Sequence, residues 1–295
     1  MKNKITLLFF IAVAMLLQSC GTKEYDKPTI TVSLEPQKYF LDKIVGDKID
    51  VSCLLSNGGN PESYEPTIND LLALEKSVAY LKMGNVGFEQ VLTDKLKQNN
   101  KTLDIYDMSK GIDFITGTHD CCDHHHHEGE HHHHDASVDP HTWTSIKNAK
   151  VIARNMYDVV TKIDTANASF YKANYDKLIA SLDSLDSYAT SKLAPHKGEA
   201  FLVWHPSLSY FARDYGLEQI TIGQIGKELS ALQLQEQIDN AHNHKARVFF
   251  FQQEFDSKQA SVVNDRIGAT MITINPLSYD WETEIRRIID AIATK

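Results

Sequence analysis

The sequence has little cysteine and no surplus of basic residues. Its 295 residues include 4 cysteines, and 30 Lys and Arg stand against 39 Asp and Glu, which gives a net charge of −9. An acidic chain without a basic block binds phosphate backbones poorly, so we expect no nucleic-acid partner. A chain of this length buries roughly three quarters of its unfolded surface and needs no disulfide framework. At roughly 100–200 residues per domain, the length predicts two domains or one large one.

Long hydrophobic runs are absent except for one near the N-terminus. This run covers residues 5–17, 13 residues in all, and is shorter than the roughly 20 that a transmembrane helix needs. Lys2 and Lys4 precede it, and a positive start followed by a short apolar core is typical of a secretory signal peptide. We therefore predict a signal peptide over residues 1–19 and a polar tether over residues 20–28.

The end of this apolar run resembles a bacterial lipobox. Leu17, Gln18 and Ser19 precede Cys20, and in a lipobox the cysteine is acylated and becomes the new N-terminus. Stable anchoring needs more than one acyl chain, and a lipoprotein cysteine carries several. The prediction is an exported protein of the periplasm or cell envelope that is held at the membrane through Cys20. The alternative is ordinary cleavage near Ser19 with an unmodified Cys20.

Apolar strand patterns alternate with helical patterns twice along the rest of the chain. The expected strands cover residues 29–34, 49–55, 78–82 and 102–106, and then 200–204, 219–222, 247–251 and 270–274. Strands separated by helices predict an α/β protein of two lobes, each with a mostly parallel sheet flanked by helices and with a ligand cleft between the lobes. We expect the N-terminal lobe over residues 29–160 and the C-terminal lobe over residues 196–295.

One long helix is predicted between the lobes, over residues 161–195. Apolar residues recur there at steps of four and three, which places them in one stripe on a helix. They are Tyr171, Tyr175, Leu178, Leu182, Leu185 and Ala189. A single continuous helix is stiffer than a hinge of two or three strands, so we expect little rotation of the lobes on ligand binding.

Histidine is abundant and unevenly distributed. Nine of the 14 histidines lie in a loop over residues 119–135, beside two adjacent cysteines. Its imidazoles and thiols are His119, Cys121, Cys122, His124, His125, His126, His127, His131, His132, His133 and His134. Nothing in this segment can pack a core, and such ligands suit zinc, copper and nickel. We expect a solvated auxiliary loop that binds metal weakly in many arrangements, or alternatively a low-complexity insertion without a function.

Two of the remaining histidines lie where a fixed metal site could form. His141 follows Pro140 in a turn that opens a helix expected over residues 142–161. His205 follows the strand 200–204, and ligands of open α/β sheets bind outside the carboxyl ends of the strands. The other three are expected to be exposed side chains: His196, His242 and His244.

Carboxylates also follow the strands of both halves. The polar turn after the strand 49–55 contains Glu62 and Glu65, which are its only strong ligand types, and Glu254 follows the strand 247–251. These glutamates are therefore further candidates for metal ligands, and the histidine and carboxylate groups of separate lobes are expected to meet in the cleft.

Taken in order, these motifs resemble the metal-specific solute-binding proteins of bacterial ABC importers, in particular the zinc-uptake branch. The resemblance covers the chain from Thr29 to Ala293. The family's ligand motifs are Asp-Pro-His-x-Tyr-Glu-Pro, Asp-Pro-His-x-Trp, His-Pro-x-x-x-Tyr-Phe and, where present, Asp-Pro-Leu. They correspond here to residues 60–66, 139–143, 205–211 and 275–277, with Glu62 in place of the first histidine and Asn275 in place of the last aspartate.

The resemblance implies a monomeric receptor that captures Zn²⁺ and delivers it to the permease of an ABC importer in the inner membrane. The implied ligands are Glu62, His141 and His205, with Asn275, Glu254 and Glu65 as lesser candidates. Zinc accepts glutamate and histidine at nearly the same distance, so glutamate can replace histidine without changing the metal. A carboxylate also moves the preference toward harder ions, so Mn²⁺ stays open as the cargo.

Two other functional classes were weighed. A zinc hydrolase could use Glu62 or Glu254 as its general base, but the sequence contains no His-Glu-x-x-His, Gly-x-Ser-x-Gly or phosphate-loop motif, so we expect no enzyme. The second class is a zinc store or a surface adhesin without a transporter. A store binds many ions with similar affinity, whereas a receptor has one tight site above a weak background.

Overall fold

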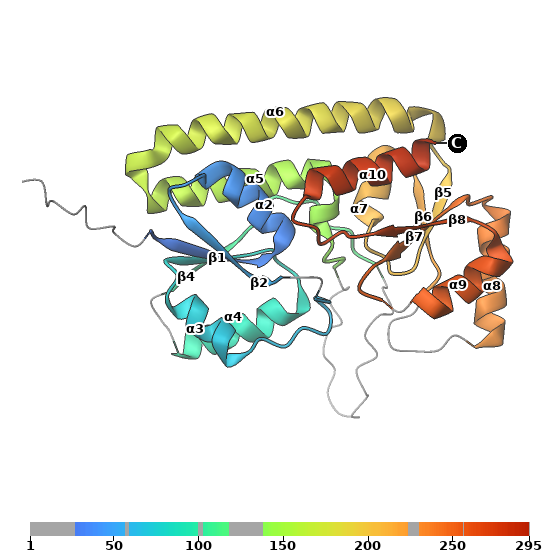
Figure 1. Cartoon of the computed structure of the whole chain (residues 1–295), viewed down its shortest axis with the longest axis horizontal. Coiled ribbons are helices and arrows are strands. Elements are labelled where there is room, and N and C mark those ends of the chain that lie inside the picture. Colours follow the sequence, from blue (N-terminus) through green and yellow to red (C-terminus); the bar gives the residue numbers. More distant parts are fainter. Residues whose placement is uncertain are drawn as a thin grey trace, which may run out of the picture.

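Two parallel β-sheets, one in each half of the chain, form the frame of the molecule (Figure 1). The computed structural model describes residues 27–56, 59–99, 103–117, 138–223, 230–255 and 257–294. The predicted α/β class with two lobes is confirmed. The signal peptide, Cys20 and the histidine-rich segment 119–135 were predicted in parts of the chain that lie outside the described residues.

The N-terminal sheet has the strand order β2-β1-β3-β4, with all pairs parallel. Its strands are β1 (Thr29–Leu34), β2 (Asp50–Leu55), β3 (Ala79–Lys82) and β4 (Asp104–Asp107), and its helices are α2 (Glu35–Val45), α3 (Ile68–Glu75) and α4 (Gly87–Asn99). Ile30, Val32 and Leu34 of the central strand are fully buried, because helices cover both faces of a parallel sheet.

The C-terminal sheet repeats this arrangement in the order β6-β5-β7-β8. Its strands are β5 (Ala200–Val203), β6 (Glu218–Thr221), β7 (Val248–Gln252) and β8 (Thr270–Ile274), and its helices are α7 (Ser209–Tyr215), α8 (Ala231–Asn243), α9 (Ser257–Ile267) and α10 (Trp281–Ala293). Strand β6 pairs with one edge of β5 and β7 pairs with the other, so the chain passes from one side of β5 to the other between β6 and β7. Ligands of open α/β sheets bind at such a crossing point, which here lies beyond the carboxyl ends of β5 and β7.

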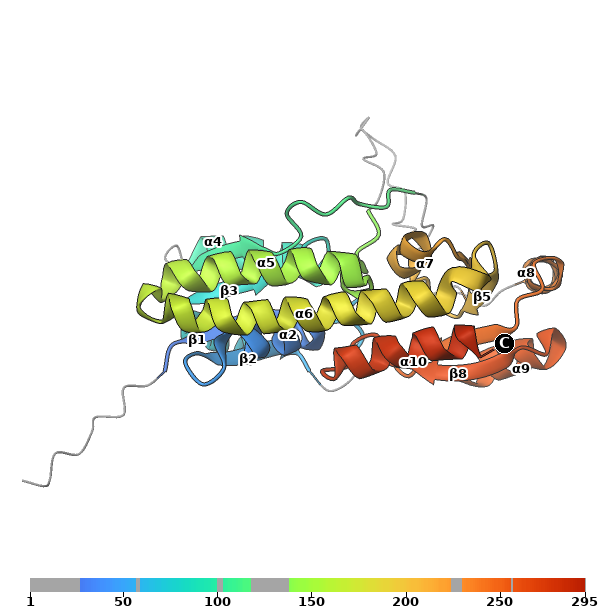
Figure 2. The same cartoon turned by 90° about the horizontal axis from the view of Figure 1, so that it is seen from above.

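A long helix, α6 (Ala168–Leu193), runs along both lobes and packs beside α5 (Ile146–Ile163) (Figures 1 and 2). Its 26 residues span about 39 Å at 1.5 Å per residue. The expected apolar stripe is buried, since Tyr171, Leu182 and Ala189 have no exposed surface. The helix expected from residue 142 begins instead at Ile146, because a 3₁₀ turn over Thr142–Thr144 precedes it and the Ser145 hydroxyl accepts a hydrogen bond from the Asn148 amide.

The two lobes share one hydrophobic core, and two buried tryptophans of this core form hydrogen bonds between the lobes. The Trp143 indole donates to the Pro276 carbonyl at 3.0 Å, and the Trp281 indole donates to the Trp143 carbonyl at 2.8 Å. The Trp281 ring also lies edge-on to Phe40 of α2, with ring centroids 4.9 Å apart. A smaller core lies between the second sheet and helices α8 and α9.

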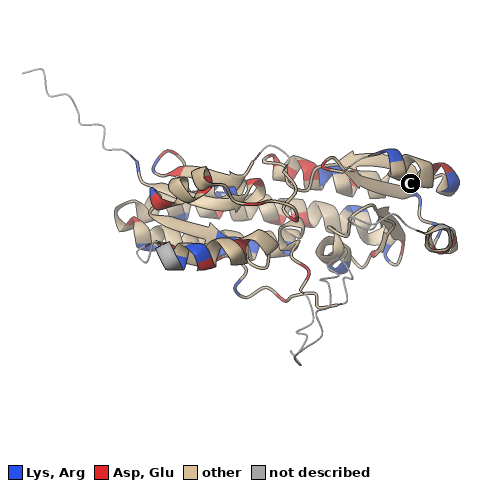
Figure 3. Cartoon of the chain, turned by 90° about the horizontal axis from the view of Figure 1, so that it is seen from below, with Lys and Arg blue, Asp and Glu red and all other residues tan. Residues whose placement is uncertain are grey.

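Acidic and basic residues are interspersed along the helices of both lobes in the view of Figure 3. Mixed charges of this kind are typical of a solvated surface. Among the described residues, no helix combines the length and the hydrophobicity that a membrane crossing requires.

Candidate metal centre

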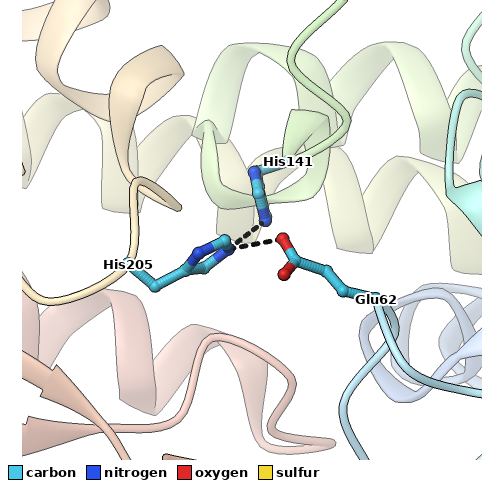
Figure 4. Close-up of side chains that lie close together, drawn as sticks. All are labelled: Glu62, His141 and His205. Atoms are coloured by element: carbon cyan, nitrogen blue, oxygen red, sulfur yellow. Dashed lines mark hydrogen bonds and ion pairs between the residues drawn. The ribbon is translucent and has the colours of Figure 1, made fainter. Parts of the chain in front are cut away.

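Three predicted ligands converge at one point between the lobes (Figure 4). The Nε2 atom of His205 lies 3.0 Å from Nε2 of His141 and 3.2 Å from Oε1 of Glu62, and one donor atom from each residue lies within 4.8 Å of the others. In a tetrahedral zinc site with bonds of about 2.0–2.1 Å, neighbouring donor atoms are about 3.3 Å apart. The spacing therefore suits a single divalent ion.

A turn after β2 positions Glu62. The side-chain oxygen of Asn60 accepts the Glu62 amide at 2.9 Å, and the Asn60 carbonyl accepts the Ser63 amide at 3.2 Å. Asparagine and aspartate both form such turns, so Asn60 can replace the aspartate of the motif. Burial raises the pKa of the Glu62 carboxyl, and the nearby His141 partly offsets this rise. Its side chain remains 29% exposed, whereas those of His141 and His205 are 7% and 5% exposed.

His141 is oriented by the buried carboxylate of Asp139. One oxygen of Asp139 accepts both the backbone amide of His141, at 2.9 Å, and its Nδ1–H, at 2.8 Å. This hydrogen bond assigns the ring proton to Nδ1, so the lone pair on Nε2 points toward His205. The sequence motif contains Asp139 but does not indicate a role for it. In the structure, Asp139 fixes the tautomer and the direction of the His141 ring, which is a candidate metal ligand.

Gln252, the last residue of β7, holds the loop that carries His205 through hydrogen bonds. This fully buried amide donates to the His205 carbonyl at 2.6 Å and to the Ser207 hydroxyl at 2.7 Å, and it accepts the His205 amide at 3.3 Å. Sequence reasoning missed Gln252. The available signal was a polar residue at the carboxyl end of the otherwise apolar run Val248–Phe251.

Two of the converging side chains, His141 and His205, line a small cavity of about 10 Å³. Its lining residues are Asn60, Pro61, His141, Trp143, His205, Ser207, Glu254, Phe255, Pro276 and Leu277. This volume holds one ion or one water molecule and excludes an organic ligand. A larger cavity of about 220 Å³ lies at the other end of the second sheet, beside Glu199 and Arg247, and contains none of the predicted ligands.

The lesser candidates differ in where the structure places them. Glu254 lines the cavity but is not part of the three-residue cluster, and among the described residues its buried Oε2 atom has no hydrogen-bond partner. Burial raises the pKa of Glu254. The side-chain oxygen of Asn275 instead accepts the Leu277 amide at 3.1 Å within a turn. Glu65 is exposed and lies outside the three-residue cluster.

The other described histidines do not join the cluster. His242 and His244 are exposed, as expected. The prediction that His196 is exposed is wrong, because its residue surface is only 9% accessible and its Nδ1 lies 3.0 Å from Glu199. A short 3₁₀ turn over Ala194–His196 folds the ring back against that carboxylate, which the local sequence pattern did not indicate.

Comparisons with known proteins agree with this architecture. The family model for the zinc-uptake complex component A periplasmic, ZnuA, matches residues 30–294. The high-affinity zinc uptake system protein ZnuA of Bacillus subtilis (strain 168) is 31% identical over 282 residues, which cover 92% of this chain and 88% of that protein.

Solved structures of ZnuA are similar to this chain across its length. A crystal structure of ZnuA has a TM-score of 0.80 at 33% identity and covers 91% of this chain and 99% of its own. A structure of a 138-173 deletion mutant of ZnuA with zinc bound has a TM-score of 0.79 at 34% identity. It covers 91% of this chain and 97% of its own. The zinc-binding protein AdcA of Streptococcus pyogenes is 27% identical over 97% of this chain, but the chain spans only 58% of the length of AdcA.

Proposed function

This chain belongs to the family of periplasmic zinc-uptake components, and from that premise we propose that it captures Zn²⁺ in the cavity between its lobes and delivers the ion to an ABC importer. The observation that carries the proposal is the approach of Glu62, His141 and His205 to within 4.8 Å of one another. Components of this family are transport proteins, so the hydrolase hypothesis is discarded. The expected partner is the importer's permease.

Zinc is the cargo that the donor chemistry favours. Two imidazole nitrogens suit zinc, whereas manganese prefers oxygen ligands. The carboxylate of Glu62 keeps Mn²⁺ as the second candidate, because it adds an oxygen donor to the set. A cavity that holds one ion supports a receptor rather than a store that binds many ions alike.

We further propose that a lipid on Cys20 tethers the protein to the membrane outside the cytoplasm. The support is the lipobox-like sequence before Cys20. One relative, from Lactococcus lactis, is named a metal ABC transporter substrate-binding lipoprotein. Incorporation of a labelled fatty acid into the wild-type chain, and its loss in Cys20→Ala, is the expected result.

Zinc titration of the purified chain against a competing chelator tests the proposed receptor. We expect one tight site in the wild type, and a loss in His205→Ala that exceeds the roughly 10–100-fold typical of an outer-shell partner, because a direct ligand is removed. The matched control is Glu65→Gln, which alters an exposed carboxylate of the Glu62 turn and should bind like the wild type. A wild type without one tight site, or His205→Ala with unchanged affinity, contradicts the proposal.

A further inference from the structure

The carboxyl ends of β7 and β8 lie side by side next to the metal cavity. The two strands pair in parallel with Gln252 opposite Ile274, and the Gln253 amide donates to the Ile274 carbonyl at 3.1 Å. Glu254 and Asn275 are therefore neighbouring positions on one edge of the sheet, each just beyond its strand. A side chain from either position could complete the site.

The structure uses these two residues differently. The Asn275 side-chain oxygen accepts the Leu277 amide, and its backbone amide donates to Glu284 at 2.7 Å, so Asn275 holds the turn together. Glu254 instead lines the cavity together with His141 and His205. Its buried Oε2 has no hydrogen-bond partner in the part of the chain that the structure describes. A buried carboxylate oxygen without a partner is energetically costly, unless a cation is bound beside it.

The charges around the cavity also favour a cation. Among the described residues, neither lysine nor arginine lines it, while Glu254 lines the cavity and Glu62 reaches it through its contact with His205. Two ionised carboxylates carry a charge of −2 together, and one divalent ion would neutralise both. The two carboxylates would then be compensated.

We propose that Glu254 is the fourth ligand of the ion, which gives a neutral site of two imidazoles and two carboxylates. This inference rests on the proposed function, since it completes the donor set of the same cavity. The carboxylate that the family resemblance places at position 275 is thus supplied from the adjacent strand end. No coordination position is left for water, as expected of a site that holds an ion without activating a nucleophile.

The substitution Glu254→Gln tests this inference, because it keeps the side-chain size and removes the charge. We expect zinc affinity to fall by about 10–100-fold or more, as for groups that support a metal site. The visible absorption of bound Co²⁺ should change in band position and intensity, because its ligand set changes. X-ray absorption of the zinc-loaded wild type should show four nitrogen or oxygen neighbours and the outer-shell scattering of two imidazole rings.

A third readout separates a ligand from a merely structural residue. Without metal, Glu254→Gln should be at least as stable to heat as the wild type, because a buried uncompensated charge is gone. Zinc should then raise its melting temperature less than it raises that of the wild type. The variant Glu65→Gln again serves as the control, with wild-type affinity and spectrum.

The failures of the two proposals are distinguishable. If Glu254→Gln keeps the wild-type affinity and the wild-type Co²⁺ spectrum while His205→Ala loses tight binding, the fourth-ligand inference is wrong and the receptor stands. If the wild type itself has no tight site, the receptor proposal is wrong, and the fourth-ligand inference that rests on it is wrong as well.

Discussion

At the scale of single residues, each ligand is held by a polar neighbour. Asp139 fixes His141 through its Nδ1–H, and Gln252 fixes the His205 loop through two backbone contacts. A ligand whose direction is set before the ion arrives loses little conformational freedom on binding. Outer partners of this kind therefore contribute to metal affinity without touching the metal.

The substitution Asp139→Asn should weaken zinc binding by about 10–100-fold while the fold is kept, because an amide accepts the Nδ1–H less strongly and can favour the other tautomer. Competition titration measures the affinity, and circular dichroism checks the fold. Asp113→Asn, which changes a side chain that is 97% exposed, is the matched control. Wild-type affinity in Asp139→Asn would show that His141 needs no such support.

Sequence reasoning identified the residues that converge but not those that support them. Turns and strand ends visible in the local sequence made His141, His205 and several glutamates candidates, and the family resemblance selected Glu62 among the glutamates. Gln252 contacts His205 across 47 positions. Such a partner depends on which strands pair, and no local pattern encodes that.

At the scale of elements, an ionic cluster joins helices α5, α6 and α7. Lys150 of α5 lies 2.9 Å from Asp186 and 2.6 Å from Asp183 of α6, and the Tyr215 hydroxyl of α7 donates to Asp186 at 2.8 Å. Burial alone would raise the pKa of Asp186. The hydrogen bonds from Lys150 and Tyr215 outweigh burial and lower its pKa below the ordinary value.

The substitution Asp186→Asn should reduce the free energy of unfolding at neutral pH by about 1–3 kcal/mol, because it removes the negative charge and one of the two carboxylate oxygens that accept from Lys150 and Tyr215. The lowered pKa sets the sign of the pH dependence. The contribution of Asp186 is present above the unfolded pKa of about 3.9 and is lost as the pH falls through the folded value. The difference from wild type should therefore shrink below about pH 4.

Urea unfolding at pH 7 and at several acidic pH values measures this difference. Asp183→Asn is the control, because Asp183 contacts the same lysine but its side chain is 59% exposed. The free energy of unfolding of Asp183→Asn should fall by no more than about 1 kcal/mol, as for an exposed ion pair. Equal losses in both variants, or a loss that persists in acid, would count against the role of Asp186.

The elements themselves were largely predictable, and their pairing was not. Period-two and period-3.6 patterns gave the eight strands of the two sheets and the long helix α6. The start of α5 was misplaced by four residues, because Ser145 rather than His141 caps it. The order β6-β5-β7-β8 brings Glu254 beside His205, and this order follows from packing rather than from any single segment.

At the scale of the whole molecule, hydrogen bonds between the lobes hold them in one relative orientation, without a flexible hinge. The indole N–H groups of Trp143 and Trp281 each donate to a carbonyl of the other lobe. The Tyr210 hydroxyl of α7 donates to the Asp139 carbonyl at 2.7 Å. Helix α6 runs along both lobes (Figure 2). We therefore expect the site to keep its shape when the ion leaves.

Deletion of residues 120–134 should leave one tight zinc site and reduce the total number of ions bound. The reason is that Glu62, His141 and His205 lie outside the deleted stretch and are positioned by Asn60, Asp139 and Gln252, which the deletion leaves in place. Calorimetric titration of the wild type and the deletion variant counts both classes of site. Loss of the tight site on deletion would mean that the histidine-rich segment supplies a ligand.

In the proposed receptor, the unequal exposure of the three candidate ligands predicts an order of events. Glu62 reaches solvent, while both imidazoles are nearly enclosed. We therefore expect a hydrated ion to exchange its first water molecules for the carboxylate and to shed the rest as it moves inward to the rings. Departure should reverse the sequence, so the rate at which the Glu62 carboxylate dissociates from the ion should govern how long the cargo is retained.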